Sequence, residues 1–215
     1  MAVFWYSLFT FATLALLPWG LNLHSQVHCL ELTLLVIITI AIVYDNAIVS
    51  LGHLIGKGNI LLWLSQPRFF LHVVLTPFSV LVALCQSERA GILLTSSPTL
   101  KLIAWLLTIA LIVSDLFRYY QKFNPIPVWF QGTLRYTNAS VSHPPIPAMI
   151  TIVLVGIIGI LIWHQAQWPW LFISSLVMFI GGAIPFSLVG PTVCSGVEVF
   201  LLIGFLATEA FVQSV

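Results

Sequence analysis

The chain has 215 residues, of which 60% are hydrophobic and only 6% are charged. A soluble domain carries about 25% charged residues, because its surface faces water. Seven Lys and Arg and six Asp and Glu residues are too few to cover a soluble protein of this length, and they leave no basic surface for nucleic acid. The hydrophobic content also excludes a disordered chain. We therefore expect an all-α, polytopic integral membrane protein with the lipid bilayer, and no nucleic acid, as its partner.

Seven apolar segments are long enough to cross a bilayer, which needs about 20 residues per helix. They cover about residues 3–22, 28–50, 68–86, 101–119, 147–165, 168–189 and 195–213. Their apolar runs are continuous rather than alternating, which indicates helices rather than strands. No Lys or Arg precedes Lys57, so the first segment lacks the basic start of a signal peptide and is expected to be a retained helix. We predict one bundle of about seven transmembrane helices, a single domain over residues 1–215.

The distribution of Lys and Arg between the two sides predicts the orientation. With seven helices, the N-terminus and the second, fourth and sixth connections share one side. That side carries Lys57, Arg68, Arg118, Lys122 and Arg135, and the other side carries Arg89 and Lys101. Because basic residues accumulate on the cytoplasmic side, the N-terminus is expected there. The absence of a targeting segment favours a bacterial inner or thylakoid-type membrane.

One connection, residues 120–146, is much longer than the others. Four of its residues are proline (Pro125, Pro127, Pro144 and Pro145), which removes hydrogen-bond donors and disfavours helix. Its aromatic residues, Trp129, Phe130 and Tyr136, are typical of the membrane interface. We predict a long irregular interfacial loop, either a lid over a site or a simple connection.

Ionisable residues inside the predicted helices point to a functional site, since each costs about 2.5–3.5 kcal/mol at a helix centre. Placing residues by depth at about 1.5 Å per residue brings six of them to the leaflet that faces the N-terminus. They are Asp45, Arg68, His72, Asp115, Arg118 and Glu198. Arg68 is expected at the mouth of its helix, with His72 one turn deeper on the same face.

This cluster provides the candidate site residues. The candidate catalytic residues are Asp45, His72 and Asp115, since buried carboxyl and imidazole groups perform acid–base chemistry. The candidate substrate-binding residues are Tyr44, Asn46, Arg68, Arg118, Tyr119 and Glu198. No cofactor and no metal site is predicted, because Cys29, Cys85 and Cys194 are scattered without the paired spacing of a metal motif.

These residues favour a membrane-embedded enzyme that acts on a lipid or isoprenoid ligand by acid–base chemistry such as cyclisation or isomerisation. The main alternative is a non-enzymatic membrane subunit or assembly factor in which the polar cluster locks the helices together. Weaker alternatives are a small transporter and a bis-histidine haem protein using His53 and His72, although His53 is expected beyond the end of its helix. Protein partners are not predicted.

Overall fold

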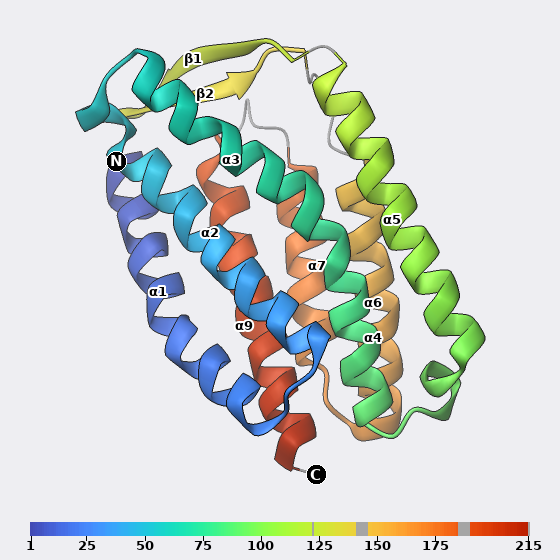
Figure 1. The fold of residues 1–215 in the computed structure, drawn as a ribbon. Coiled ribbons are helices and arrows are strands. Elements are labelled where there is room, and N and C mark those ends of the chain that lie inside the picture. Colours follow the sequence, from blue (N-terminus) through green and yellow to red (C-terminus); the bar gives the residue numbers. More distant parts are fainter. Residues whose placement is uncertain (122, 141–145, 185–189, 215) are drawn as a thin grey trace.

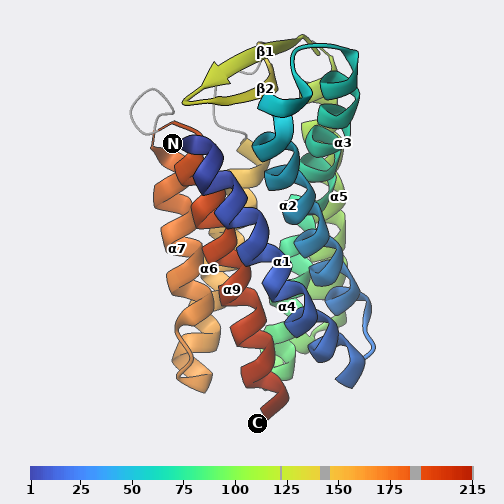
Figure 2. The same cartoon turned by 90° about the vertical axis from the view of Figure 1, so that its left-hand side faces the viewer.

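The computed structural model describes residues 1–121, 123–140, 146–184 and 190–214. It is a bundle of long helices with a β-hairpin across one end (Figures 1 and 2). The elements are α1 (Ala2–Gln26), α2 (Leu30–Ile55), α3 (Asn59–Leu75), α4 (Ser79–Arg89), α5 (Pro98–Tyr120), β1 (Pro125–Phe130), β2 (Thr133–Asn138), α6 (Ile146–Ala166), α7 (Trp170–Ala183) and α9 (Thr192–Ser214), with 3-10 turns at Thr76–Phe78 and Leu93–Ser96.

Within the described ranges, six helical segments are long and apolar enough to cross a membrane, with α3 and α4 together forming one segment over Asn59–Arg89. The sixth predicted segment, over about residues 168–189, corresponds to α7, which is equally apolar but has 14 residues; positions 185–189 of that segment lie outside the described residues. The structure therefore confirms the all-α, multi-pass class predicted from the sequence.

Successive segments run in opposite directions through the bundle. The N-terminus, the turn between α2 and α3 and the hairpin lie at one end, called here the hairpin end, while the turn between α1 and α2 and the C-terminus lie at the other, called here the C-terminal end (Figure 1). Connections that alternate between two ends are the arrangement expected of a multi-pass protein.

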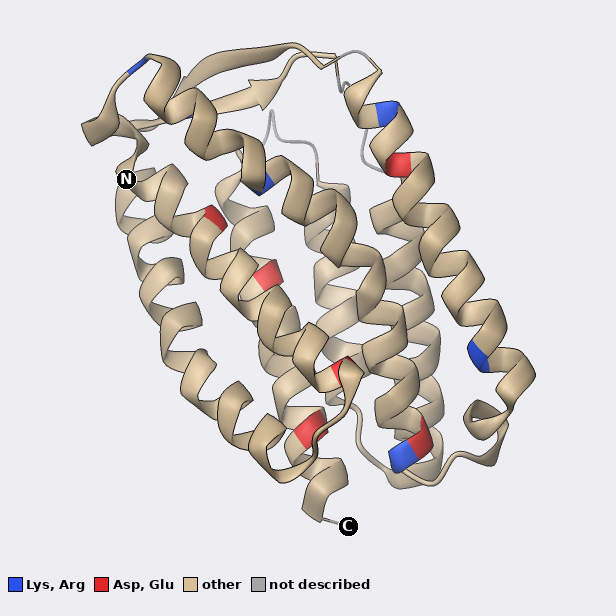
Figure 3. Ribbon diagram, in the orientation of Figure 1, with Lys and Arg blue, Asp and Glu red and all other residues tan. Residues whose placement is uncertain are grey.

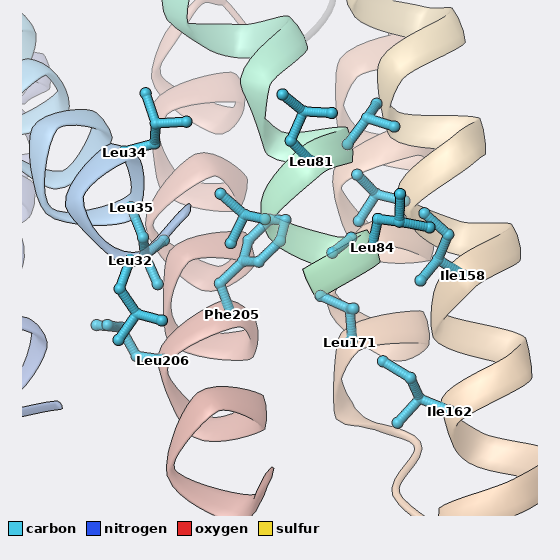
Figure 4. Packing of buried hydrophobic residues seen from close by; sticks show 14 of the residues in the cluster. Leu32, Leu34, Leu35, Leu81, Leu84, Ile158, Ile162, Leu171, Phe205 and Leu206 are labelled. Atoms are coloured by element: carbon cyan, nitrogen blue, oxygen red, sulfur yellow. The ribbon is translucent and has the colours of Figure 1, made fainter. Parts of the chain in front are cut away.

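The apolar core joins the two halves of the chain. Leucine and isoleucine side chains from α2, α4, α6, α7 and α9 meet in one cluster (Figure 4). The helix backbones approach closely within it: a Cβ on Gly159 of α6 would lie 2.6 Å from the backbone nitrogen of Phe172 on α7. Small residues at such contacts are typical of membrane helices, whose association depends on close packing.

The predicted start of the third helix was wrong. The helix begins at Asn59 rather than at residue 68, because the apolar run 60–64 continues it and Pro67 is accommodated inside it. Arg68 consequently lies about 14 Å along the helix instead of at its mouth. The second helix also extends further than predicted, to Ile55, so His53 lies within it rather than beyond its end.

The prediction of an irregular loop over residues 120–146 was wrong for residues 125–138, while positions 122 and 141–145 lie outside the described residues. Residues 125–138 form an antiparallel hairpin in which Phe130 pairs with Thr133. The two turn residues, Gln131 and Gly132, have φ angles of 44° and 91°, the conformation that two-residue hairpins prefer.

The prolines in this hairpin occupy positions where they cost no ladder bond. Hydrogen-bonded and non-hydrogen-bonded pairs alternate along an antiparallel ladder. Counting from the Phe130–Thr133 pair that flanks the turn, Pro125 and Pro127 fall at non-hydrogen-bonded positions. Their missing N–H groups therefore remove no hydrogen bond between the two strands. Proline content alone does not indicate these positions, and the prediction was wrong for this reason.

The hairpin is packed firmly on the helices. Leu134 and Tyr136 form a buried cluster with Ile48 of α2 and Leu61 of α3. A Cβ on Gly52 of α2 would overlap the carbonyl oxygen of Leu134, so β2 lies directly against that helix. This contact fixes the position of β2, which also carries Arg135, relative to α2.

Candidate functional site

An ion pair between α2 and α3 lies at the centre of the hairpin end. Arg68 Nε donates to Asp45 Oδ1 at 2.8 Å. The Arg68 side chain is 7% exposed and that of Asp45 31%. A charge in a membrane helix requires a partner of this kind, and the structure thus brings together two of the predicted site residues from different helices.

Two other predicted binding residues, Tyr44 and Asn46, donate hydrogen bonds to backbone carbonyl groups of α3 and α2. The Tyr44 hydroxyl donates to the carbonyl of Leu64 at 2.9 Å, which joins α2 to α3. The Asn46 side-chain amide is fully buried and donates to the carbonyl of Ile42 at 3.0 Å. Its Oδ1 is buried and has no hydrogen-bond partner among the described residues.

Asp115 lies on α5 with its side chain 8% exposed. No hydrogen bond or ion pair joins it to another described residue, Arg118 included, although these two residues share a helix face. Arg118 is exposed. Asp115 is therefore a buried carboxyl group without a fixed partner, within electrostatic range of His72 and Arg118.

The expectation that His72 is buried deep in the bundle was wrong, because its side chain is exposed. Four residues along a helix correspond to a rotation of only about 40° beyond one full turn, so Arg68 and His72 share one side of α3, but only the Arg68 side chain is buried. It is nevertheless within electrostatic range of both Asp115 of α5 and Glu198 of α9.

Glu198 brings α9 into the same region. It is half-buried, and the charges of His72, Asp45 and Arg68 all reach its carboxyl group. The Cys194 thiol, one turn earlier, lies 4.0 Å from Glu198 Oε1.

Arg135 was missed as a site residue because the sequence argument counted it only as a loop charge. It lies in the middle of β2, and Tyr6, Arg68, Asp45 and Cys194 are the charged or titratable groups within its range. Burial lowers the pKa of its guanidinium below the ordinary value, so the site disfavours this charge without a counter-ion. The alternation of Leu134, Arg135 and Tyr136, typical of a strand, was the signal that could have revealed it.

Several hydrogen-bond donors in this region are buried and have no partner among the described residues. They are Tyr6 Oη, Ser65 Oγ, Arg68 Nη1, Arg135 Nε and Thr192 Oγ1, called here the donor cluster. The Tyr6 hydroxyl lies close to the hydroxyls of Ser195 and Thr192 without forming a hydrogen bond of ordinary geometry with either. An unsatisfied buried donor costs about 1–3 kcal/mol, and a group that presents several acceptor oxygens would satisfy the donor cluster.

Aromatic rings flank the ion pair on the side of α5. The Phe69 ring lies 5.5 Å from that of Tyr119, and the Arg68 guanidinium lies 5.8 Å from the Phe69 ring centroid. Tyr119, a predicted binding residue, also accepts a hydrogen bond at its carbonyl from Asn138 of the hairpin at 3.2 Å. This aromatic wall is a suitable surface for an apolar chain next to the polar groups.

No protein-family model matches the chain, and neither a curated protein nor a solved structure does. The chemistry of the site is therefore the evidence for function.

Proposed function

We propose that the protein is a membrane-embedded enzyme that acts on an anionic lipid or isoprenoid amphiphile at the hairpin end. The observation that carries this proposal is the donor cluster, in which one nitrogen of each of two guanidinium groups and three hydroxyls are buried without a hydrogen-bond partner among the described residues. The excess of Lys and Arg on the hairpin side supports an orientation in which this end lies in the cytoplasmic leaflet.

The head group in this proposal is a phosphate. A phosphate presents several acceptor oxygens and matches the fork geometry of arginine. Arg68 keeps Nη1 available while its Nε is held by Asp45. Asp45 thus acts as a positioning residue for Arg68, and Arg135 supplies a second guanidinium from the hairpin.

The reaction in this proposal is proton transfer to and from the apolar chain. Asp115 lies near the aromatic wall, without an ion-pair partner among the described residues. As a carboxylic acid it would donate a proton to a carbon–carbon double bond, and as a carboxylate it would then remove a proton from a neighbouring carbon. The protons balance and a double bond moves or a ring closes. His72, within range of Asp115, would tune or relay this proton.

Removing the Arg135 charge is expected to lower retention of the amphiphile about 10-fold or more, since a hydrogen bond to a charged group contributes about 1.5–3 kcal/mol. The measurement is native mass spectrometry of Arg135→Gln and the unchanged protein, both released in mild detergent. Lys57→Gln is the matched control, because Lys57 is an exposed cation at the same end and its loss removes the same charge from the surface.

A phosphate-bearing passenger of defined mass that is retained by the unchanged protein and by Lys57→Gln, but lost from Arg135→Gln, supports the proposal. No passenger in any of the three proteins, or equal retention in all three, contradicts it.

A second candidate function is an assembly or structural protein in which the polar cluster joins the helices. The Asp45–Arg68 distance of 2.8 Å favours it, because an ion pair between two membrane helices is by itself a helix contact.

The variants Asp45→Asn and Arg68→Gln separate the two candidate functions. If the site binds a phosphate, Arg68→Gln lowers retention about 10-fold or more, while Asp45→Asn lowers it much less, because Arg68 loses a positioning contact but keeps its charge. If the pair is only a helix contact, both variants lower the thermal midpoint to a similar extent and neither changes retention. Native mass spectra and unfolding midpoints of the same samples distinguish these results.

A further inference from the structure

Three metal-ligating side chains meet at the C-terminal end, far from the donor cluster. Cys29 lies at the N-cap of α2, Glu31 is in the first turn of that helix and Cys85 is on α4. One ligand atom from each, two thiol sulfurs and a carboxylate oxygen, lies within 4.8 Å of the others. The sequence did not reveal this group, because Cys85 is far along the chain from the other two residues.

The cations around this group already have partners. Arg89 Nη1 lies 2.5 Å from Glu209 Oε1, and Lys101 Nζ lies 2.7 Å from Glu88 Oε1. Glu31 takes part in no hydrogen bond or ion pair of its side chain within the part of the chain that the structure describes. Acidic and basic residues lie in this lower part of the bundle in Figure 3. A half-buried carboxylate beside two thiols thus has no ion-pair partner among the described residues.

The elements that carry the ligands are held in place by other contacts. The Thr33 hydroxyl donates to the Cys29 carbonyl at 3.1 Å and lies 2.9 Å from His24 Nε2. On the other side, the Gln86 amide, next to Cys85, donates to the carbonyl of Phe205 on α9 at 2.9 Å. These contacts hold the backbone that carries Cys29 and the turn of α4 that carries Cys85.

A cavity of about 210 Å³ opens beside the group, and Glu31 and Cys85 are among its lining residues, with Glu88, Lys101 and Trp105. A metal held by three protein ligands at this wall would keep a fourth position directed to water or to a small ligand. Open fourth positions distinguish reactive zinc sites from closed structural ones.

We propose that Cys29, Glu31 and Cys85 bind a Zn²⁺ ion through two thiolates and one carboxylate, with the fourth position open to the cavity. Thiolate sulfur and carboxylate oxygen are both ligands of zinc, at about 2.3 Å and 2.0–2.2 Å. Ligand atoms in a tetrahedral zinc site are then roughly 3.5–3.8 Å apart, which small side-chain rotations reach from the present separation. This site is independent of the function proposed for the hairpin end.

The test is zinc binding by the full-length protein in mild detergent, measured as bound metal per chain after ZnCl₂ is added and excess removed. We expect one Zn²⁺ per chain for the unchanged protein and none for Cys29→Ser or Cys85→Ser. For Glu31→Gln we expect a loss of affinity of about 10-fold or more, at least the loss seen when an outer-shell partner is removed. Cys194→Ser is the matched control, because Cys194 lies on α9 near Glu198 at the hairpin end, and it should bind zinc normally.

Two further measurements keep the result interpretable if a variant folds poorly. Zn²⁺ should raise the unfolding midpoint of the unchanged protein and of Cys194→Ser, since a ligand that binds only the folded state stabilises it. Co²⁺ should give a thiolate charge-transfer absorption that Cys194→Ser retains. The proposal is overturned if the unchanged protein binds no zinc, or if Cys29→Ser or Cys85→Ser binds as much zinc as the unchanged protein. It is also overturned if the mass and thiol count of the unchanged protein show a Cys29–Cys85 disulfide.

Discussion

Replacing Arg89 with glutamine should lower the free energy of unfolding by about 3–5 kcal/mol, the cost of leaving a buried charge without its partner. The Glu209 side chain is 0% exposed, and Arg89 lies 2.5 Å from it. Gln213 donates to Glu209 at 2.7 Å and Gln86 at 3.3 Å. These two amides would remain, but neither carries a charge. The decrease is measured as the shift in the unfolding midpoint of protein in mild detergent.

The neighbouring ion pair between Lys101 and Glu88 is the control. Its side chains are 43% and 33% exposed, and exposed pairs contribute about 0–1 kcal/mol. Lys101→Gln should therefore change stability much less than Arg89→Gln. Equal shifts for the two variants would mean that water reaches Glu209 and that the pair does not hold α4 to α9.

Replacing Asp115 with asparagine should lower turnover of the co-purified amphiphile by about 10²- to 10⁴-fold, the usual contribution of a general acid or base. This prediction rests on the function proposed for the hairpin end. Asparagine has nearly the same shape as aspartate, and no ion pair of Asp115 with a described residue is lost, so the folded yield should persist. Turnover is followed in proteoliposomes as the appearance of a product that separates from the substrate by chromatography.

Ser114→Ala provides the control, because Ser114 is the adjacent polar residue and is exposed on the same helix. It should retain full turnover. If Asp115→Asn turns over the amphiphile as fast as the unchanged protein, Asp115 takes no part in the reaction. If the same variant still retains the amphiphile, the proposed head-group site is not contradicted by that result.

The membrane class and the approximate positions of the apolar segments follow from the sequence alone, because hydropathy over a window of about 20 residues is a local property of the chain. The alternation of connections between the two ends follows from the same segments. The meeting of Asp45 with Arg68 was also within reach, since an ionisable residue in an apolar helix requires a partner and depth can be counted along each helix.

Two predictions, the irregular loop and the start of α3, were wrong because local sequence patterns do not specify tertiary contacts. The proline content of residues 125–138 indicated an irregular loop. A proline removes a hydrogen bond between the strands only at a hydrogen-bonded position, and the pairing register decides which positions those are. The start of α3 was placed at Arg68 because a charge was read as the edge of the membrane, whereas the contact with Asp45 allows this charge inside the bundle.

Only the tertiary structure decided which distant residues share a site. Arg135 joins the hairpin-end groups because β2 packs on α2 through Gly52 and Leu134. Cys85 meets Cys29 and Glu31 because α4 packs beside α2. Such contacts depend on how helices rotate and dock against one another, and no local pattern of the chain specifies these rotations.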